Sequence, residues 1–264
     1  MNTVLIKKEN AICELTLNRP QSLNALNDEL MQDLMSAFQG IEQDSSIRCV
    51  VIKGAGPAFM AGGDIKMFHQ QLGQAPEQLR ATFKQFVGTL HPLIEKMAGL
   101  RVPLVAAVHG PVAGFGVSLT MLCDFVIAAA DSYFTLAYVH LGTSPDGSST
   151  YFLPRLVGLR RAKEIALLGD RIPADEAVRL GLAYKAVPPA GLEAETVAFA
   201  ARLAAGPTHA YANTKALLHA SFNRGLTEQM DAEVECFADC ASGPDFAEGV
   251  KSFVERRKPS FMGK

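Results

Sequence analysis

The stretch that decides the fold is residues 104–122, which read LVAAVHGPVAGFGVSLTML. Residues 104–108 are apolar without interruption, which predicts a short buried strand. The glycines that follow predict a bend, because glycine adopts positive φ angles and lets the backbone approach a ligand closely. Residues 117–122 predict a helix that starts just after the glycines. The first turn of a helix has unpaired N–H groups and favours negative charge.

A second stretch has the same form. Residues 49–52 predict a buried strand, and AFMAGGDIK follows at residues 58–66. If the two glycine loops converge, their N–H groups would form a pocket that stabilises an enolate or another oxyanion. Each loop on its own also fits an ordinary connection between a strand and a helix.

Working outward, strands and helices alternate as far as about residue 187, and only helices follow. Further strands are predicted around residues 4–6, 12–17, 125–129, 133–135 and 184–187, with a Lys-Lys-Glu-Asn turn joining the first two. Helices are predicted at residues 26–41, 77–98, 156–168 and 174–180, and from 192 onward with breaks at 206–207 and 243–244. The pattern predicts an α/β core with mainly parallel strands over residues 1–190. A helical region over 191–264 would pack on that core or on a neighbouring subunit.

Composition narrows the class of protein. The chain has 264 residues and a net charge of −2, without the basic surface that nucleic-acid binding needs. Its longest apolar runs, 102–108 and 119–130, are shorter than the roughly 20 residues of a membrane helix. Five scattered cysteines and no visible secretory signal predict a cytoplasmic protein with reduced thiols. We therefore expect no nucleic-acid partner and no membrane partner.

Motifs of other enzyme classes are missing. Leu119 stands where a dinucleotide fingerprint would have its third glycine, and no phosphate-binding Gly-x-x-x-x-Gly-Lys sequence occurs. No Gly-x-Ser-x-Gly elbow indicates a serine hydrolase. The histidines show no His-x-x-x-His spacing, so no metal site is predicted.

Four segments carry a resemblance to a known family. AFMAGGDIK at 58–66 and HGPVAGFGVSL at 109–119 resemble the two signature loops of the crotonase superfamily, the enoyl-CoA hydratase/isomerase family. NRPQSLNAL at 18–26 resembles its CoA-contacting segment, and residues 248–261 resemble its C-terminal helix and tail. The segments span the chain and follow one another in the family's order.

The resemblance implies a crotonase-like spiral of ββα units, with 191–264 as a helical trimerisation region of a homotrimer or homohexamer. It implies an acyl-CoA substrate, so that coenzyme A enters as part of the substrate and no separate cofactor is expected. The two oxyanion-binding N–H groups fall on Gly63 and Phe115. Contacts to the substrate fall on Ser22, Leu23, Ala25, Ala61, Asp64, Ile65, Lys66 and Tyr138. Lys66 fits a solvated loop lysine equally well.

The chain departs from the hydratases of that family at the catalytic positions. Their two glutamates correspond to Ser118 and Tyr138, and neither side chain supplies a carboxylate. The isomerase and dehalogenase branches place an acid at Asp146, although Pro-Asp-Gly is also a common turn sequence. Beside Phe115, Tyr138 and Leu141, this carboxyl group is expected to have a raised pKa. One carboxylate is enough for Δ3,Δ2-enoyl-CoA isomerisation, with Asp146 as the proton shuttle.

Three alternatives stay open. A hydratase would have to use another acid or a water held by Tyr138. The dehalogenase branch uses a histidine base, which corresponds to His91, but a packed histidine is the more common explanation, and Leu90 stands at an aromatic position of that branch. A non-catalytic acyl-CoA binder would have lost both glutamates. His140 is predicted to be a structural neighbour of the pocket.

Overall fold

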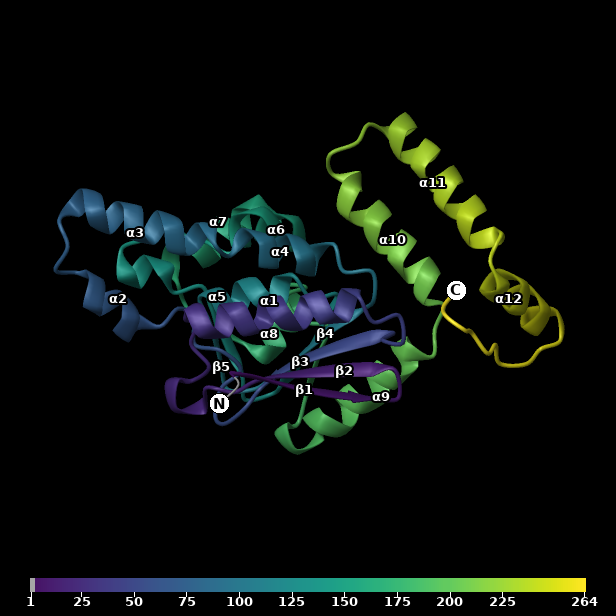
Figure 1. Cartoon of the computed structure of the whole chain (residues 1–264), viewed down its shortest axis with the longest axis horizontal. Helices are drawn as coiled ribbons and strands as arrows, with labels where there is room; N and C mark the ends of the chain where they lie inside the picture. The colour runs from purple at the N-terminus through teal and green to yellow at the C-terminus, as the bar shows by residue number, and fades with distance from the viewer. Residues whose placement is uncertain (1–2) are drawn as a thin grey trace.

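A computed structural model describes residues 3–264 and contains two sheets (Figure 1). The six-stranded sheet has the order β1-β2-β3-β4-β6-β9, and the three-stranded sheet has the order β5-β7-β8. The strands are β1 Val4–Glu9, β2 Ile12–Leu17, β3 Cys49–Gly54, β4 Leu104–Val108, β5 Pro111–Ala113, β6 Phe125–Ala129, β7 Tyr133–Thr135, β8 Ile172–Pro173 and β9 Lys185–Val187. Within the larger sheet only β1 and β2 pair antiparallel, which confirms the predicted core of mainly parallel strands.

Helices surround the sheets and continue to the C-terminus. They are α1 Asp28–Glu42, α2 Ile65–Gln71, α3 Pro76–Gly88, α4 His91–Ala98, α5 Phe115–Met121, α6 Ser149–Val157, α7 Leu159–Leu168, α8 Ala174–Arg179, α9 Leu192–Ala204, α10 Thr208–Ser221, α11 Leu226–Ala241 and α12 Pro244–Val254. Short 3₁₀ helices lie at η1 Pro20–Ser22, η2 Tyr138–Leu141 and η3 Pro189–Gly191.

The larger sheet is covered on both faces, which explains why its central strand β4 is wholly apolar. On one face, α1 buries the side chains at 30, 34, 38 and 41, and Asn27 caps this helix by accepting a hydrogen bond from Leu30 N at 3.0 Å. On the other face, Phe199 and Leu203 of α9 pack against Val105 and Ile127. The glycine loops leave the sheet between these layers.

Four local predictions were wrong. The first hairpin turns at Asn10-Ala11, where both residues have positive φ angles, so β1 includes Lys7, Lys8 and Glu9. The helix predicted for 77–98 is two helices, because Pro92 lies in the first turn of a new helix that begins at His91. The helix predicted for 156–168 is likewise divided at Gly158, whose φ is +76°. The C-terminal region has an additional break between α10 and α11.

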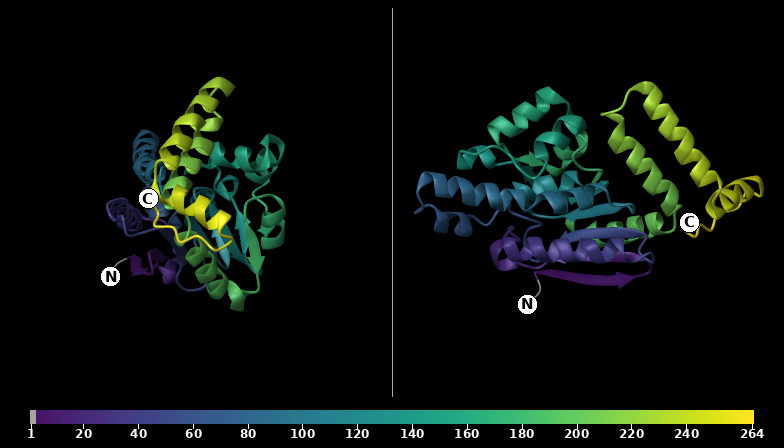
Figure 2. Two further views of the ribbon diagram at one scale, coloured as in Figure 1. Left: turned by 90° about the vertical axis from the view of Figure 1, so that its right-hand side faces the viewer. Right: turned by 45° about the horizontal axis from the view of Figure 1, so that its top comes forward.

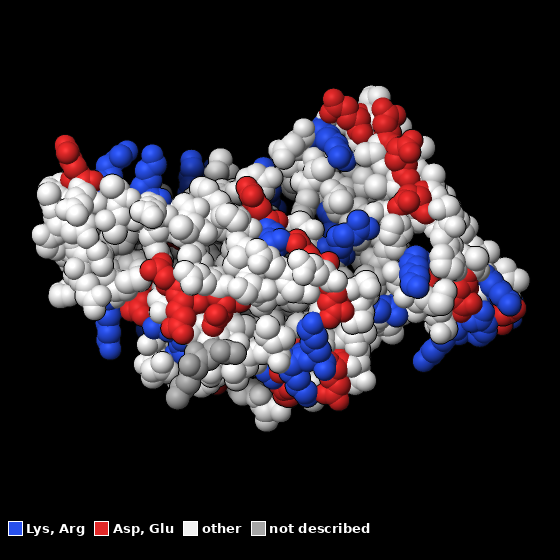
Figure 3. All heavy atoms as spheres, in the orientation of Figure 1, with Lys and Arg blue, Asp and Glu red and all other residues white. Residues whose placement is uncertain are grey.

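The C-terminal helices divide into two groups. While α9 packs on the sheet, α10, α11 and α12 project away from the core, as both views show (Figures 1 and 2). Acidic side chains cover one side of α11 (Figure 3), and large apolar side chains on the same helix are exposed. Among residues 3–264, no helix has the length and apolar character needed to cross a membrane.

Candidate active site

The two glycine loops lie side by side. Ala113 N donates a hydrogen bond to Met60 O at 2.8 Å, and Phe59 N donates one to His109 O at 2.9 Å. Met60 and Val112 also form an isolated parallel bridge. The two glycine loops, whose convergence the sequence left as a condition, are thus joined by backbone hydrogen bonds.

Glycine is required where these loops meet. Gly62 and Gly114 have φ angles of +97° and +49°. A Cβ atom on Gly114 would lie 3.3 Å from Gly62 Cα, and a Cβ atom on Gly116 would lie 2.5 Å from Met60 O. Any side chain at these positions would push the loops apart.

The residues that follow Gly62 and Gly114 are Gly63 and Phe115, whose backbone N–H groups make no hydrogen bond within residues 3–264. Phe115 is the first residue of α5, and its N–H group therefore has no acceptor within the helix. Both residues line the same cavity.

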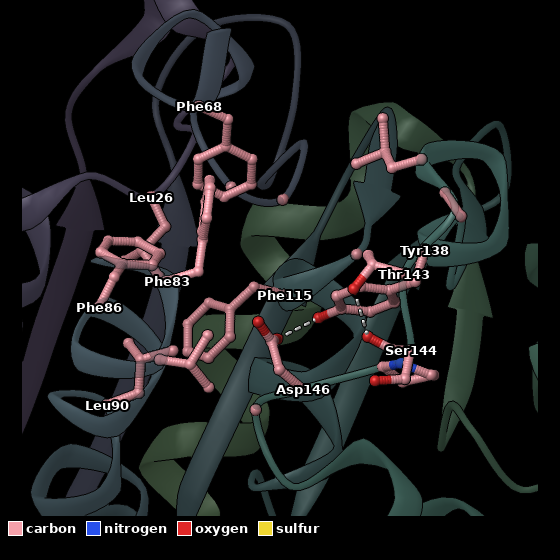
Figure 4. Close-up of a pocket in the computed structure, with 18 of the residues that line it drawn as sticks. Leu26, Phe68, Phe83, Phe86, Leu90, Phe115, Tyr138, Thr143, Ser144 and Asp146 are labelled. Carbon is pink, nitrogen blue, oxygen red and sulfur yellow. Dashed lines mark hydrogen bonds between the residues drawn. The ribbon is translucent and has the colours of Figure 1, made fainter. Parts of the chain in front are cut away.

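That cavity has a volume of about 930 Å³ and is mostly apolar. Its walls come from α2, α3 and α4 on one side and from α5, η2 and the loop after η2 on the other (Figure 4). The large apolar side chains that line it are Leu26, Ile65, Phe68, Leu72, Phe83, Phe86, Val87, Leu90, Ile94, Phe115, Leu136 and Leu141. Such a space suits the apolar part of a small-molecule substrate.

Three phenylalanines of α2 and α3 were not predicted to belong to the site. Phe68 packs edge to face against Phe83 and Phe86, with ring centroids 5.1 and 5.7 Å apart. The Phe68 ring also lies against Gly63, where an added Cβ atom would approach it to 2.6 Å. The sequence did carry a signal, because Phe83, Phe86 and Leu90 repeat at helical spacing and so form one apolar face. In the structure no residue of α3 is buried, so this face is not covered by the core.

Asp146 places a carboxylate in the cavity. Tyr138 Oη donates a hydrogen bond to Asp146 Oδ1 at 2.5 Å (Figure 4). The Asp146 carbonyl oxygen accepts hydrogen bonds from Ser149 N and Ser149 Oγ, so this residue does form the turn that its sequence suggested. The two interpretations of Pro-Asp-Gly are compatible, because the backbone makes the turn and the side chain faces the cavity.

Burial raises the pKa of Asp146, and the hydrogen bond from Tyr138 partly offsets that effect. The predicted direction is confirmed, whereas the bond to Tyr138 was not foreseen. The pKa of the Tyr138 hydroxyl is itself raised, first by burial and second by the negative charge of Asp146. Tyr138 therefore stays protonated and acts as a hydrogen-bond donor.

The position of the first hydratase glutamate is filled by a buried serine. Ser118 is fully buried, and its hydroxyl donates to the Asp146 carbonyl oxygen at 3.3 Å. The carboxylates that line the cavity within residues 3–264 are Asp146 and Glu95, and Glu95 is exposed on α4. Over the same residues, no group of three His, Cys, Asp or Glu side chains could hold a metal ion.

The prediction that His91 is packed was wrong. His91 begins α4, is exposed and lines the cavity, because α4 starts there instead of continuing from α3. His140 lies outside the cavity lining, and its Nε2 is 3.1 Å from Gly169 O. This contact confirms the structural role expected for His140.

The segment predicted to contact coenzyme A lies beside the first glycine loop. Ala61 N donates to Leu23 O at 3.0 Å, which brings Ser22, Leu23 and Ala25 next to residues 61–66. Asp64 accepts hydrogen bonds from Lys66 N and Met67 N and so caps α2. Ile65 and Lys66 are exposed, and Ile65 also lines the cavity.

Arg19 was not predicted to contribute to this region. Its Nη2 lies 3.0 Å from Asp64 Oδ2, and its Nη1 donates to Ala25 O. Both side chains of the ion pair are largely buried. Arg19 thus fixes the 18–26 segment to the start of α2. The resemblance had assigned Asp64 to the substrate, but the carboxylate is already engaged by Arg19 and the cap.

Comparisons with known proteins agree over the whole chain. A family profile described as "Enoyl-CoA hydratase/isomerase" matches residues 7–264. A probable enoyl-CoA hydratase of Rhodobacter capsulatus is 34% identical and covers 100% of this chain and 99% of its own. A 1,2-epoxyphenylacetyl-CoA isomerase of Escherichia coli is also 34% identical, with 100% of each chain covered.

Solved structures match the fold of this chain over nearly its whole length. The crystal structure of a putative enoyl-CoA hydratase/isomerase from Mycobacterium abscessus has a TM-score of 0.93 and 29% sequence identity, covering 99% of this chain and 100% of that one. The crotonase fold predicted from the signature loops is therefore confirmed. The chain belongs to the enoyl-CoA hydratase/isomerase family of enzymes.

Proposed function

We propose that this enzyme shifts the double bond of 3-enoyl-CoA thioesters to the C2–C3 position. Asp146 is the proton carrier, and the N–H groups of Gly63 and Phe115 bind the thioester oxygen. The observation that carries the proposal is the joint presence of these two unpaired amides and one half-buried carboxylate in a single apolar cavity.

The reaction follows from these three groups. The Asp146 carboxylate takes a proton from C2, and the electron pair moves onto the thioester carbonyl to form a dienolate. The N–H groups of Gly63 and Phe115 stabilise the new negative charge on oxygen. The Asp146 carboxyl group then returns the proton to C4, which leaves the double bond between C2 and C3. Because burial raises the pKa of Asp146, its two protonation states are closer in free energy than those of an exposed aspartate.

Hydration is the second candidate, because the relative from Rhodobacter capsulatus is named a hydratase. Addition of water needs a base for the water and an acid for the carbon. Ser118 and Tyr138, which stand at the hydratase glutamate positions, supply neither a carboxylate nor an ionised oxygen. The chemistry of these side chains favours the isomerase.

Coenzyme A is proposed to lie along the junction of residues 18–26 and 61–66. Ser22, Leu23, Ala25 and Ala61 meet there through the bond from Ala61 N to Leu23 O, and they would contact the adenine and pantetheine parts. Lys66 is exposed on the first turn of α2, where an ammonium group can meet the phosphates of coenzyme A. In this arrangement Asp64 contributes to coenzyme A binding indirectly, because its ion pair with Arg19 orders the start of α2 and the 18–26 segment.

We also propose that the enzyme assembles into homotrimers, alone or paired into hexamers. Leu226, Met230, Val234 and Phe237 form one stripe of α11 and are 54–79% exposed. A continuous apolar stripe of this size favours contact with another protein surface. The acidic side of the same helix would remain in water.

Product analysis tests the reaction. The enzyme is incubated with a trans-3-enoyl-CoA and, separately, with the matching trans-2-enoyl-CoA, and products are followed by ultraviolet absorbance and mass spectrometry. We expect a conjugated thioester of unchanged mass from the first substrate. Faster formation from the second substrate of a product heavier by one water would contradict the isomerase and support the hydratase.

A further inference from the structure

We propose that Tyr138 is a positioning residue that holds one oxygen of Asp146 and leaves the other as the base. This inference deepens the proposed function, because it concerns the same carboxylate. It assigns to Tyr138 a role other than the substrate contact that the family resemblance implies.

The Tyr138 backbone is held by hydrogen bonds at both its N–H and its carbonyl group. Its backbone N–H donates to Leu136 O at 2.7 Å, and its carbonyl oxygen accepts from Thr143 N at 3.2 Å. The side chain is buried, with 9% of the residue exposed. The hydroxyl group therefore has a fixed position from which it reaches Asp146.

Asp146 is fixed at its backbone and at one carboxylate oxygen. The hydrogen bonds from Ser149 hold its carbonyl group, and the bond from Tyr138 holds Oδ1. Among residues 3–264, Oδ2 accepts no hydrogen bond from the protein. Figure 4 shows the carboxylate between the Tyr138 hydroxyl and the Phe115 ring. Oδ2 is thus the oxygen available to a substrate proton.

The other titratable groups that line the cavity come from α2 and α4, not from the segments that surround Asp146. His69 comes from α2, and His91 and Glu95 come from α4, and all three are exposed. From the helix after the turn, Ser149 binds only the carbonyl oxygen, and α5 contributes the neutral Ser118. Tyr138 is therefore the titratable group that acts on Asp146, and its hydrogen bond favours the ionised carboxylate.

The replacement Tyr138→Phe tests the proposal, since it removes only the hydroxyl group. We expect kcat to fall by about ten- to a hundredfold, the effect typical of a hydrogen bond to a charged group, with KM changed little. Loss of the bond raises the pKa of Asp146. The acidic limb of the kcat/KM profile should therefore move to higher pH. Tyr151→Phe, which changes an exposed tyrosine outside the catalytic cavity, should leave both quantities unchanged.

A second measurement does not depend on turnover. Infrared difference spectra of protein labelled with ¹³C-aspartate report whether Asp146 is protonated. The band of Asp146 is identified by its absence from the spectra of Asp146→Asn. In Tyr138→Phe the protonated carboxyl band should persist to higher pH than in the wild type. An unmoved infrared titration together with unchanged kcat would overturn the positioning role. Full activity of Asp146→Asn would instead overturn the proposed function, so the two failures are distinguishable.

Discussion

Gly62 and Gly114 meet backbone to backbone, so that a Cβ atom on Gly114 would lie 3.3 Å from Gly62 Cα. Each is followed in the chain by a residue that lines the cavity, Gly63 and Phe115, and neither residue's N–H group donates a hydrogen bond within residues 3–264. This close contact, together with the backbone hydrogen bonds between the loops, sets the separation of the two amides. A site that binds an oxyanion requires such a fixed separation.

Gly114→Ala should separate the two amides. Its φ of +49° and its contact with Gly62 are unfavourable for alanine, and we expect kcat to fall at least about a hundredfold, the effect of losing one oxyanion donor. The matched control is Gly158→Ala, where φ is +76° but no atom lies within 4 Å. The control should lose stability through backbone strain yet keep kcat. Equal losses of kcat in both variants would contradict a special role for Gly114.

Asp146→Asn should make the protein more stable at neutral pH. Burial raises the pKa of Asp146 above its unfolded value, so its contribution to stability is complete at low pH and is lost as pH rises through the folded pKa. Asparagine does not ionise and avoids that loss. Calorimetry should show Tm higher by about 2–4 °C at pH 7, and no difference at a pH below the unfolded pKa. A lower Tm at pH 7 would show that the carboxylate stabilises the fold.

Arg19→Met should weaken coenzyme A binding and the fold together. It removes the largely buried ion pair with Asp64 and the bond to Ala25 O, which we expect to reduce the free energy of unfolding by about 1–3 kcal/mol. KM for the acyl-CoA should rise while kcat changes little. Lys7→Met removes an exposed ion pair with Glu9 and should change neither quantity.

The stability difference caused by Arg19→Met should depend on pH. Burial alone would raise the pKa of Asp64, but the hydrogen bonds from Arg19 and the Met67 amide outweigh it and lower the pKa. The stabilisation is therefore present above the unfolded pKa and is lost as pH falls through the folded pKa. A difference between the proteins that stays constant down to strongly acidic pH would contradict this account.

Charges placed on the apolar stripe of α11 should disperse the oligomer. Val234 and Phe237 are 65% and 68% exposed, and Val234→Glu with Phe237→Glu would bring two carboxylates into the proposed contact. Light scattering after size-exclusion chromatography should then give the mass of a single chain instead of a trimer or hexamer. Glu235→Gln, at an exposed position on the opposite side of α11, should keep the wild-type mass. A wild-type protein that is itself a monomer would contradict the assembly.

The sequence predicted those parts of the site that depend on local chemistry. Glycines at 62, 63, 114 and 116 identified both loops, because few other residues tolerate such backbone angles and contacts. Asp146 was found by its place in the family's order of motifs. The sequence left the convergence of the loops as a condition, and the structure meets it because the loops follow the neighbouring parallel strands β3 and β4.

What the sequence did not reveal depends on tertiary contacts. Phe68, Phe83 and Phe86 line the cavity only because α2 and α3 fold over it, and the break before His91 turned a predicted packed histidine into a cavity residue. The bond between Tyr138 and Asp146 joins a 3₁₀ helix to a turn eight residues later, and no periodic pattern predicts that geometry.

Proton exchange at C2 tests the central claim most directly. A saturated or 3-unsaturated acyl-CoA is incubated in deuterated water with the wild type or with Asp146→Asn, and deuterium in the acyl group is measured by mass spectrometry. The account predicts incorporation at C2 with the wild type, at least about a hundredfold slower incorporation with Asp146→Asn, and unchanged thioester binding. Incorporation at the wild-type rate by Asp146→Asn would show that another group removes the proton and would contradict the account.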